Sequence, residues 1–166
     1  YNGIADKTIQ SAFDSFQSVR RRQELRGEVN GIAVYDDFAH HPTAIRETVT
    51  AIKQKHPGRR LITVFEPRSN TSVLKIHQDA LIDSFKKADE VILTTPHRLE
   101  LTPLEQQLEV REVLKSLTKI KIPAYEFPQV EGIIKHLKLN CRSGDVVLIM
   151  SNGKFDNIHQ RLLEEL

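Results

Sequence analysis

Short apolar segments alternate along the chain with longer amphipathic ones, and this alternation predicts the secondary structure. Apolar runs of strand length occur at 31–35, 61–65, 91–94 and 146–150. Segments whose apolar residues recur every three or four positions, as on one face of a helix, lie at 4–17, 42–55, 71–88, 130–137 and 155–165. Strands that alternate with helices indicate a mostly parallel sheet covered on both faces. We therefore predict an α/β, Rossmann-like, three-layer domain.

Two local signals describe the edges of this sheet. Residues 23–29 are extended in character and lead into Asn30-Gly31, a strong hairpin signal. An antiparallel N-terminal hairpin is therefore expected to add one edge. Residues 120–127 predict a short strand that Pro123 interrupts, which is typical of an edge strand because proline has no N–H to donate.

Two prolines mark helix starts. Pro42 is expected to open a helix that runs to about Lys55, since proline suits the first helical position. Pro103 is expected to open another helix. Its inward-facing residues would be Leu104, Leu108, Leu114 and Leu117.

Composition narrows the class of protein. At 166 residues the chain is one domain by length. Its 24 basic and 22 acidic side chains give a net charge of +2, which provides no argument for nucleic acid as a partner, and the longest apolar run suits a strand rather than a membrane span. A single cysteine, Cys141, excludes an internal disulfide and fits a reducing compartment. The chain starts without methionine or an apolar leader, so we expect a cytoplasmic piece of a longer protein.

Polar loops follow four of the predicted strands, at 36–42, 66–72, 94–98 and 151–156. In open α/β sheets ligands bind where strands end, so these loops are the candidate site. The sequence contains neither GxGxxG nor GxxxxGK[ST], the glycine-rich loops that hold phosphates. A nucleotide would therefore have to be shared with another domain.

The first loop concentrates ionisable side chains: Asp36, Asp37, His40 and His41 precede Pro42. One interpretation takes the four as metal ligands, although no further His or Cys cluster completes such a site. In a second, one aspartate anchors the turn and one histidine caps the helix. The favoured hypothesis is a shared nucleotide site in which one carboxylate accepts hydrogen bonds from ribose hydroxyls.

The second and fourth loops carry groups suited to anions. Arg68, expected at the start of a helix, presents a fork for a carboxylate or phosphate, while residues 69–71 could alternatively cap that helix. Residues 151–153, Ser-Asn-Gly, suit a small carboxylate or amide ligand, or a plain turn, with the glycine expected at positive φ. The basic run 20–22 is interpreted as a solvated surface, and isolated histidines such as His159 are interpreted as surface or internally satisfied residues.

Three segments resemble the C-terminal domain of the Mur ligases: 21–27 (Arg-Arg-Gln-Glu-Leu-Arg-Gly), 36–43 (Asp-Asp-Phe-Ala-His-His-Pro-Thr) and 65–71 (Phe-Glu-Pro-Arg-Ser-Asn-Thr). The second segment also resembles the L-alanine-adding members of that family. The third, together with Met-Ser-Asn-Gly-x-Phe at 150–155, resembles the murein peptide ligases. Residues 154–156, Lys-Phe-Asp, depart from that pattern, where more glycine is expected.

This resemblance implies an ATP- and Mg²⁺-dependent ligase of peptidoglycan recycling. It would join L-Ala-γ-D-Glu-meso-diaminopimelate, as a tri-, tetra- or pentapeptide, to UDP-N-acetylmuramate through an acyl phosphate. The alternatives are an L-alanine-adding ligase and a stand-alone nucleotide- or peptide-binding module. Residues 1–20 would lead in from a missing central domain that binds ATP and Mg²⁺, and residues 21–166 would form the closing, substrate-binding domain. That domain would be inactive alone, with neither nucleic acid nor membrane as a partner.

The resemblance also assigns residues. Arg22 would reach the nucleotide and Asp37 its ribose. The incoming peptide would contact His41, Arg68, Ser69, Asn70, Ser151, Asn152 and Gly153. Asp36 and His40 are flanking candidates. Neither a catalytic residue nor a metal ligand is expected within this domain.

Overall fold

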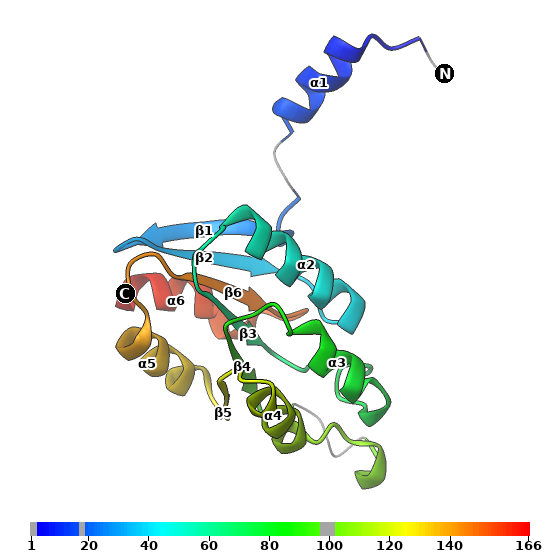
Figure 1. Ribbon diagram of the computed structural model, residues 1–166, viewed down its shortest axis with the longest axis vertical. Helices are drawn as coiled ribbons and strands as arrows, with labels where there is room; N and C mark the ends of the chain where they lie inside the picture. Colours follow the sequence, from blue (N-terminus) through cyan, green and yellow to red (C-terminus); the bar gives the residue numbers. More distant parts are fainter. Residues whose placement is uncertain (1–2, 17–18, 97–101) are drawn as a thin grey trace.

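A six-stranded sheet forms the centre of the computed structural model, which describes residues 3–16, 19–96 and 102–166 (Figure 1). The strand order is β1-β2-β6-β3-β4-β5. The strands are β1 (Glu24–Val29), β2 (Ile32–Asp37), β3 (Leu61–Phe65), β4 (Glu90–Thr94), β5 (Ala124–Phe127) and β6 (Val146–Met150). All neighbouring pairs are parallel except β1 and β2. The predicted α/β class, with an antiparallel hairpin at one edge, is confirmed.

Helices cover both faces of the sheet, as Figure 1 shows. One face carries α2 (Pro42–Lys55), α3 (Gln78–Ser84) and α4 (Val110–Lys119); the other carries α5 (Val130–Asn140) and α6 (Ile158–Glu165). Every residue of the central strand β6 is buried, and its side chains alternate between the two cores. A strand covered on both faces is therefore apolar throughout, as its sequence predicted.

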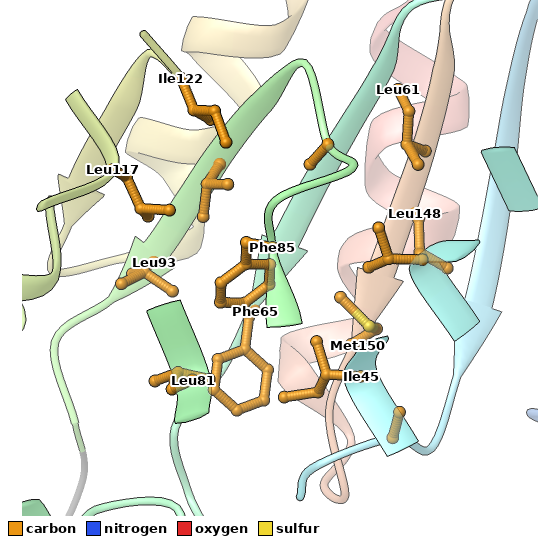
Figure 2. Close-up of a cluster of buried hydrophobic side chains, with 14 of the residues drawn as sticks. Ile45, Leu61, Phe65, Leu81, Phe85, Leu93, Leu117, Ile122, Leu148 and Met150 are labelled. Carbon is orange, nitrogen blue, oxygen red and sulfur yellow. The ribbon is translucent and has the colours of Figure 1, made fainter. Parts of the chain in front are cut away.

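Two aromatic rings organise the larger core. Phe65 ends β3, and Phe85 follows α3 directly; both are fully buried, with ring centroids 6.0 Å apart. Figure 2 shows these rings with Leu81 on one side and with Ile45 and Met150 on the other. Side chains from α2, α3, β3 and β6 thus meet around one aromatic pair, which joins helices to strands far apart in sequence.

The first helix, α1 (Asp6–Asp14), stands away from the sheet (Figure 1). None of its residues is buried, and Ile9 and Phe13 are exposed on its apolar side. The predicted helix exists but is shorter than 4–17. Within the described ranges, no helix combines the length and apolarity needed to cross a membrane.

The hairpin turn depends on glycine. Asn30 and Gly31 have φ of +52° and +77°, as a tight hairpin requires. A Cβ at Gly31 would lie 2.3 Å from Ser143 Oγ, so a side chain there would displace the serine hydroxyl as well as adopt a strained φ. The Asn-Gly signal in the sequence therefore marked the turn correctly.

The helix predicted over 71–88 begins later than expected. A single 3₁₀ turn, η1 (Lys75–His77), precedes α3 at Gln78. Before it, the amide and hydroxyl of Ser72 donate to Ser69 Oγ and carbonyl oxygen at 3.0 and 3.1 Å. Such local hydroxyl bonds compete with helix formation.

The helix predicted from Pro103 is also wrong in its first part. Only a 3₁₀ turn, η3 (Leu104–Gln106), forms there, and Leu104 is 82% exposed rather than inward-facing. The amide of Leu108 donates to the carbonyl oxygen of Val73 at 2.8 Å, so its backbone is committed to another segment. Leu108 and Leu117 are buried as predicted, and α4 begins only after this contact.

At the far edge, β5 is shorter than the predicted strand over 120–127. Lys121 has φ of +65° and Pro123 donates no hydrogen bond, so pairing starts at Ala124. The edge position is confirmed. At the end of α5, Cys141 is a free thiol; burial, followed by the charge of Asp145, raises its pKa to about 12.

We expect Phe85→Ala to lower the free energy of unfolding by about 3–5 kcal/mol, because it empties a fully buried aromatic site. Phe16→Ala is the matched control, since Phe16 is 66% exposed. Urea unfolding followed by circular dichroism would measure both. Equal effects of the two substitutions would contradict this description of the core.

Candidate functional site

The carboxyl ends of four neighbouring strands lie level. Asp37 and Phe65 both pair with Met150, and Leu93 pairs with Phe65. After β2 and β3 the chain turns to α2 and α3 on one face, whereas after β6 it turns to α6 on the other. Neighbouring strands whose loops diverge in this way leave a crevice that typically binds ligands. Because β6 lies between β2 and β3, the crevice has β6 at its centre.

Four buried polar side chains line this edge on the face of α5 and α6. They come from neighbouring strands in the order β2, β6, β3, β4, are all 1–3% exposed, and we call them the polar row: Asp36, Ser151, Glu66 and Thr94. The hydroxyl of Ser151 donates to Glu66 and accepts a hydrogen bond from the amide of Gly153 at 2.8 Å. The row therefore fixes the turn that follows β6.

Arg68 lies against this turn. An ideal Cβ on Gly153 would be 2.8 Å from both Cδ and Nη1 of Arg68, so a side chain at this position would displace the guanidinium from the turn. The Arg68 Nη1 atom is 3.6 Å from Glu66 Oε1, while the side chain remains 46% exposed. The φ angle of Gly153 is not positive, so the expectation of a positive φ at this glycine was wrong. The absence of a Cβ at Gly153 leaves room for Arg68 beside the crevice, where the charge of Arg68 stays accessible.

A second cluster joins the start of the domain to its end. The Arg21 guanidinium donates to Ser151 O at 2.5 Å and to Asp36 Oδ1 at 3.4 Å. His159 Nε2 lies 3.3 Å from the same Asp36 oxygen, outside hydrogen-bond alignment. Burial acts to raise the pKa of Asp36, but His159 and Arg21 outweigh it, so the pKa is below its ordinary value. The interpretation of Arg21 as a solvent-facing residue is therefore wrong.

Asp37 anchors the first loop. Its carboxylate accepts hydrogen bonds from the amides of Ala39 at 2.7 Å and Gln23 at 2.8 Å, and from the Thr48 hydroxyl at 3.4 Å. The side chain is 2% exposed. Asp37 is therefore the aspartate that anchors the turn, as one of the interpretations of this loop predicted. Its contact with a ribose stays a prediction.

The two histidines of this loop also make local contacts. His41 Nδ1 accepts the amide of Thr43 at 3.4 Å and so caps α2, while His40 Nδ1 lies 2.9 Å from the Phe38 carbonyl oxygen. Among the residues that the structure describes, no group of three or more His, Cys, Asp or Glu side chains is placed to hold a metal ion. The capping role predicted for one histidine is confirmed.

Arg22 occupies the outer side of the same edge. It is exposed, with its guanidinium carbon 5.9 Å from the centre of the Phe38 ring. The next residue, Gln23, is fixed through its amide by Asp37. Asp37 thus holds the backbone that carries Arg22, and the nucleotide contact of Arg22 stays a prediction.

Arg68 is not at a helix N-terminus, contrary to the expectation for the second loop. The next α-helix begins ten residues later, at Gln78, and Ser69 bonds Ser72 instead of capping it. The helix dipole therefore adds nothing at Arg68. Any affinity of this loop for anions rests on the guanidinium itself.

Three hollows open at this edge. The first, of about 440 Å³, is lined by Arg68, Ser69, Asn70, Thr71 and Asn152. The second, of about 360 Å³, is lined by Glu66, Arg68, Thr94, Phe155, Asp156 and residues 128–131 at the start of α5. The third, of about 210 Å³, is lined by Arg21, Arg26, Asp36, Gly153, Lys154, Asn157, His159 and Gln160. Arg68 lines the first and second hollows, so the same guanidinium contributes positive charge to both.

Unpaired polar atoms mark the same region. Within the described part of the chain, three buried side-chain polar atoms lack a hydrogen-bond partner: Thr94 Oγ1, Asn152 Oδ1 and His159 Nε2. Each such atom costs about 1–3 kcal/mol if it stays unsatisfied. Thr94 Oγ1 and Asn152 Oδ1 each line a hollow, where water or a bound polar group can complete them, whereas His159 Nε2 faces Asp36 Oδ1 at 3.3 Å.

Sequence reasoning missed Arg21, Glu66, Thr94 and His159 as members of the site. The alternation of side chains along a strand could have identified two of them. It places Glu66 and Thr94 on the same face of the sheet, at the ends of the neighbouring strands β3 and β4. His97 and Arg98, from the loop at 94–98, lie outside the described residues.

The turn after β6 takes an unusual backbone path. Phe155, Asp156 and Asn157 have φ of +46°, +48° and +53°. They form η4 (Phe155–Asn157), a short 3₁₀ segment before α6. Left-handed backbone is costly for residues with a Cβ. The glycine-richer pattern expected for residues 154–156 from the family resemblance would therefore adopt this path at lower cost than the present sequence.

Comparison with known proteins gives consistent matches. Residues 21–153 match the family model described as Mur ligase, glutamate ligase domain. Over 165 residues the chain is 43% identical to the UDP-N-acetylmuramate–L-alanyl-γ-D-glutamyl-meso-2,6-diaminoheptandioate ligase of Escherichia coli (strain K12), covering 99% of this chain and 34% of that protein. It is 33% identical over 166 residues to the UDP-N-acetylmuramate–L-alanine ligase of Agathobacter rectalis, covering 98% and 35%.

A solved structure agrees with these matches. The murein peptide ligase from Psychrobacter arcticus superposes with a TM-score of 0.75 at 41% identity, covering 98% of this chain and 33% of that one. The chain therefore spans about a third of the length of the proteins that it matches.

We expect Asp36→Asn to destabilise the domain by on the order of 2 kcal/mol at neutral pH, because it leaves Arg21 and His159 beside a neutral group. The folded-state pKa of Asp36 is lowered, so its stabilisation is present above the unfolded value of 3.8 and is lost as pH falls through the folded value. Urea unfolding at pH 7 and pH 3 would show the difference from wild type shrinking in acid. A difference independent of pH would contradict the charge-based account.

We expect the double substitution Asp156→Gly/Asn157→Gly to raise the melting temperature, since both residues adopt left-handed backbone. The gain is about 1 kcal/mol in total, after the loss of the exposed ion pair between Asp156 and Arg161. Glu164→Gly, in the last turn of α6, is the control; its backbone is helical rather than left-handed, so glycine there should not raise the melting temperature. Calorimetry would compare the three proteins, and a lower melting temperature for the double variant would refute the backbone argument.

Proposed function

Because the chain belongs to the Mur ligase family, we propose that it is the C-terminal, substrate-binding domain of an ATP-dependent ligase. The ligase joins L-Ala-γ-D-Glu-meso-diaminopimelate to UDP-N-acetylmuramate in peptidoglycan recycling, in the cytoplasm. The observation that carries this proposal is the placement of Arg68 over the Ser151–Gly153 turn, at the crevice of the sheet.

The peptide side of the proposal rests on charge and space. A muropeptide stem carries several carboxylates, and Arg68 offers them an accessible guanidinium, the group best suited to bidentate binding. Ser69, Asn70 and Asn152 add amide and hydroxyl groups to the first hollow, while Ser151 and Gly153 hold the turn beneath it. Two hollows that share Arg68 suit an extended peptide better than a single amino acid.

The nucleotide side rests on the opposite part of the edge. Arg22 is exposed and would contact the nucleotide, with Asp37 fixing the backbone beside it. Direct contact of Asp37 with a ribose would need the 21–23 segment to move, because its carboxylate is buried beneath that segment. His41 is exposed at the start of α2 and would contact the incoming substrate, with His40 as the flanking candidate.

The rest of the reaction is assigned to domains outside this chain. The substrate carboxylate attacks the γ-phosphate of ATP, giving an acyl phosphate and ADP; the peptide amine then attacks the acyl carbon, phosphate leaves, and the amine loses a proton. A central domain would bind ATP and Mg²⁺, and closure of the present domain would exclude water from the acyl phosphate. Residues 1–20 would lead in from that domain, and the exposed apolar side of α1 would pack against it.

An L-alanine-adding ligase is the second candidate, favoured by the identity to the Agathobacter rectalis protein. The experiment uses the full-length protein with ATP, Mg²⁺ and UDP-N-acetylmuramate, plus either L-alanine or the tripeptide. Mass spectrometry of the UDP-linked product distinguishes the two reactions. Formation of the tripeptide adduct alone would support the proposal. Formation of the alanine adduct would favour the second candidate, and formation of neither adduct would favour a stand-alone binding module.

We expect Arg22→Ala in the full-length protein to raise the KM for ATP about tenfold, through loss of a charge-assisted contact. Arg20→Ala is the matched control, because Arg20 is exposed two residues away and has no assigned role. Initial rates at varied ATP would measure both variants. Equal ATP kinetics for Arg22→Ala and wild type would remove the nucleotide assignment.

A further inference from the structure

Two residues with left-handed backbone flank Arg22. Arg21 has φ of +56° and Gln23 has φ of +48°, and neither is a glycine or an asparagine, the residues that adopt this conformation most readily. Such strain persists only where surrounding contacts fix the backbone, and it often marks a functional site. The exposed Arg22 therefore projects from a segment whose conformation has to be held in place.

Hydrogen bonds to the backbone fix both flanking residues. The amide of Arg21 donates to Glu24 Oε2 at 2.7 Å, and its carbonyl oxygen accepts the amide of Phe38 at 2.8 Å. The amide of Gln23 donates to Asp37 Oδ2 at 2.8 Å. The segment is therefore tied to the end of β2 and to the loop after it, on both sides of the residue in between.

The Arg21 side chain adds a second anchor, at the turn after β6. Its guanidinium donates to Ser151 O at 2.5 Å and to Asp36 Oδ1 at 3.4 Å, and its guanidinium carbon lies 5.2 Å from the centre of the Phe38 ring. Asp36 is 3% exposed and is also faced by His159 Nε2 at 3.3 Å. The anchor is therefore itself fixed in the body of the domain.

The two neighbouring guanidinium groups differ in their surroundings. The Arg21 side chain is 29% exposed and paired with Asp36, whereas Arg22 is exposed. Their guanidinium carbons lie 5.2 and 5.9 Å from the centre of the same Phe38 ring, within the range of a cation–π contact. Because the charge of Arg21 is compensated and its donors are engaged, that residue is less suited than Arg22 to bind a phosphate.

Resting on the proposed function, in which Arg22 contacts the nucleotide, we propose that Arg21 is a positioning residue for Arg22. Its side chain ties the 21–23 segment to the turn after β6, and its backbone holds the left-handed conformation from which Arg22 projects. Arg21 acts on the nucleotide through Arg22, without touching it. Loss of the Arg21 side chain therefore leaves the guanidinium of Arg22 present but lets it adopt orientations that miss the nucleotide.

The test is a double-substitution cycle in the full-length protein. Wild type, Arg21→Ala, Arg22→Ala and the double variant are assayed with UDP-N-acetylmuramate, L-Ala-γ-D-Glu-meso-diaminopimelate, Mg²⁺ and varied ATP. Arg21→Ala should raise the KM for ATP about fivefold with little change in kcat, because a binding contact is weakened. The double variant should match Arg22→Ala, at about tenfold, whereas independent effects would multiply to about fiftyfold. Arg20→Ala, an exposed neighbour, is the control and should keep the wild-type KM.

A merely structural role for Arg21 would give a different result. Destabilisation lowers the amount of active enzyme, and so the apparent kcat, without raising the KM for ATP. Arg21→Lys separates the two roles further, because it keeps a positive charge beside Asp36 but lacks the planar fork that reaches two acceptors. This variant should melt close to wild type and still raise the KM for ATP.

The possible outcomes distinguish this inference from the proposed function. Multiplying effects in the double variant, an unchanged KM for Arg21→Ala, or a wild-type KM for Arg21→Lys would overturn the positioning role while the ligase assignment stands. An unchanged KM for Arg22→Ala would remove the nucleotide assignment of Arg22 and this inference with it. Wild type that forms no UDP-linked product would overturn the proposed function and, with it, the role of Arg21.

Discussion

The position of β6 is the constraint on which the rest of the structure depends. This strand is the last in the sequence, yet it lies between β2 and β3 and hydrogen-bonds both. Its side chains enter both cores, and its carboxyl end separates loops that turn to opposite faces. Without β6 in that place there would be neither a continuous sheet nor a crevice at its edge.

The polar row shows how buried charge is tolerated at this edge. Glu66 is covered but engaged by the Ser151 hydroxyl and faced by Arg68, and Asp36 is faced by Arg21 and His159. A buried carboxylate is stable only with such partners. The same contacts place two guanidinium groups at fixed positions beside β6. Charge compensation and organisation of the candidate site are therefore one arrangement.

Sequence patterns were sufficient for the order of the elements, because strands buried on both faces read as apolar runs and helices as amphipathic segments. They failed where tertiary contacts decide the backbone. Leu104 fitted a helical face, yet the neighbouring 107–108 backbone pairs with 73–74 and prevents a helix there. They also failed for Arg21, since no local pattern shows that it reaches Ser151, 130 positions away. The positions of Arg68 and of the 151–153 turn at the crevice were predictable from the sequence. Both segments follow strands, and the carboxyl ends of parallel strands lie at the same edge of the sheet. What stays a prediction, such as the ribose contact of Asp37, depends on groups outside this domain.

The state of Cys141 has a practical consequence for following the motion of the domain. It is the single cysteine of the sequence, and its pKa near 12, which burial raises, keeps the thiol protonated at neutral pH. Maleimide and disulfide reagents attack the thiolate, so this position reacts slowly. A cysteine introduced on the exposed surface of α1 would be labelled selectively by a fluorophore. Within this chain, a label on a new surface cysteine would therefore report on that position rather than on Cys141.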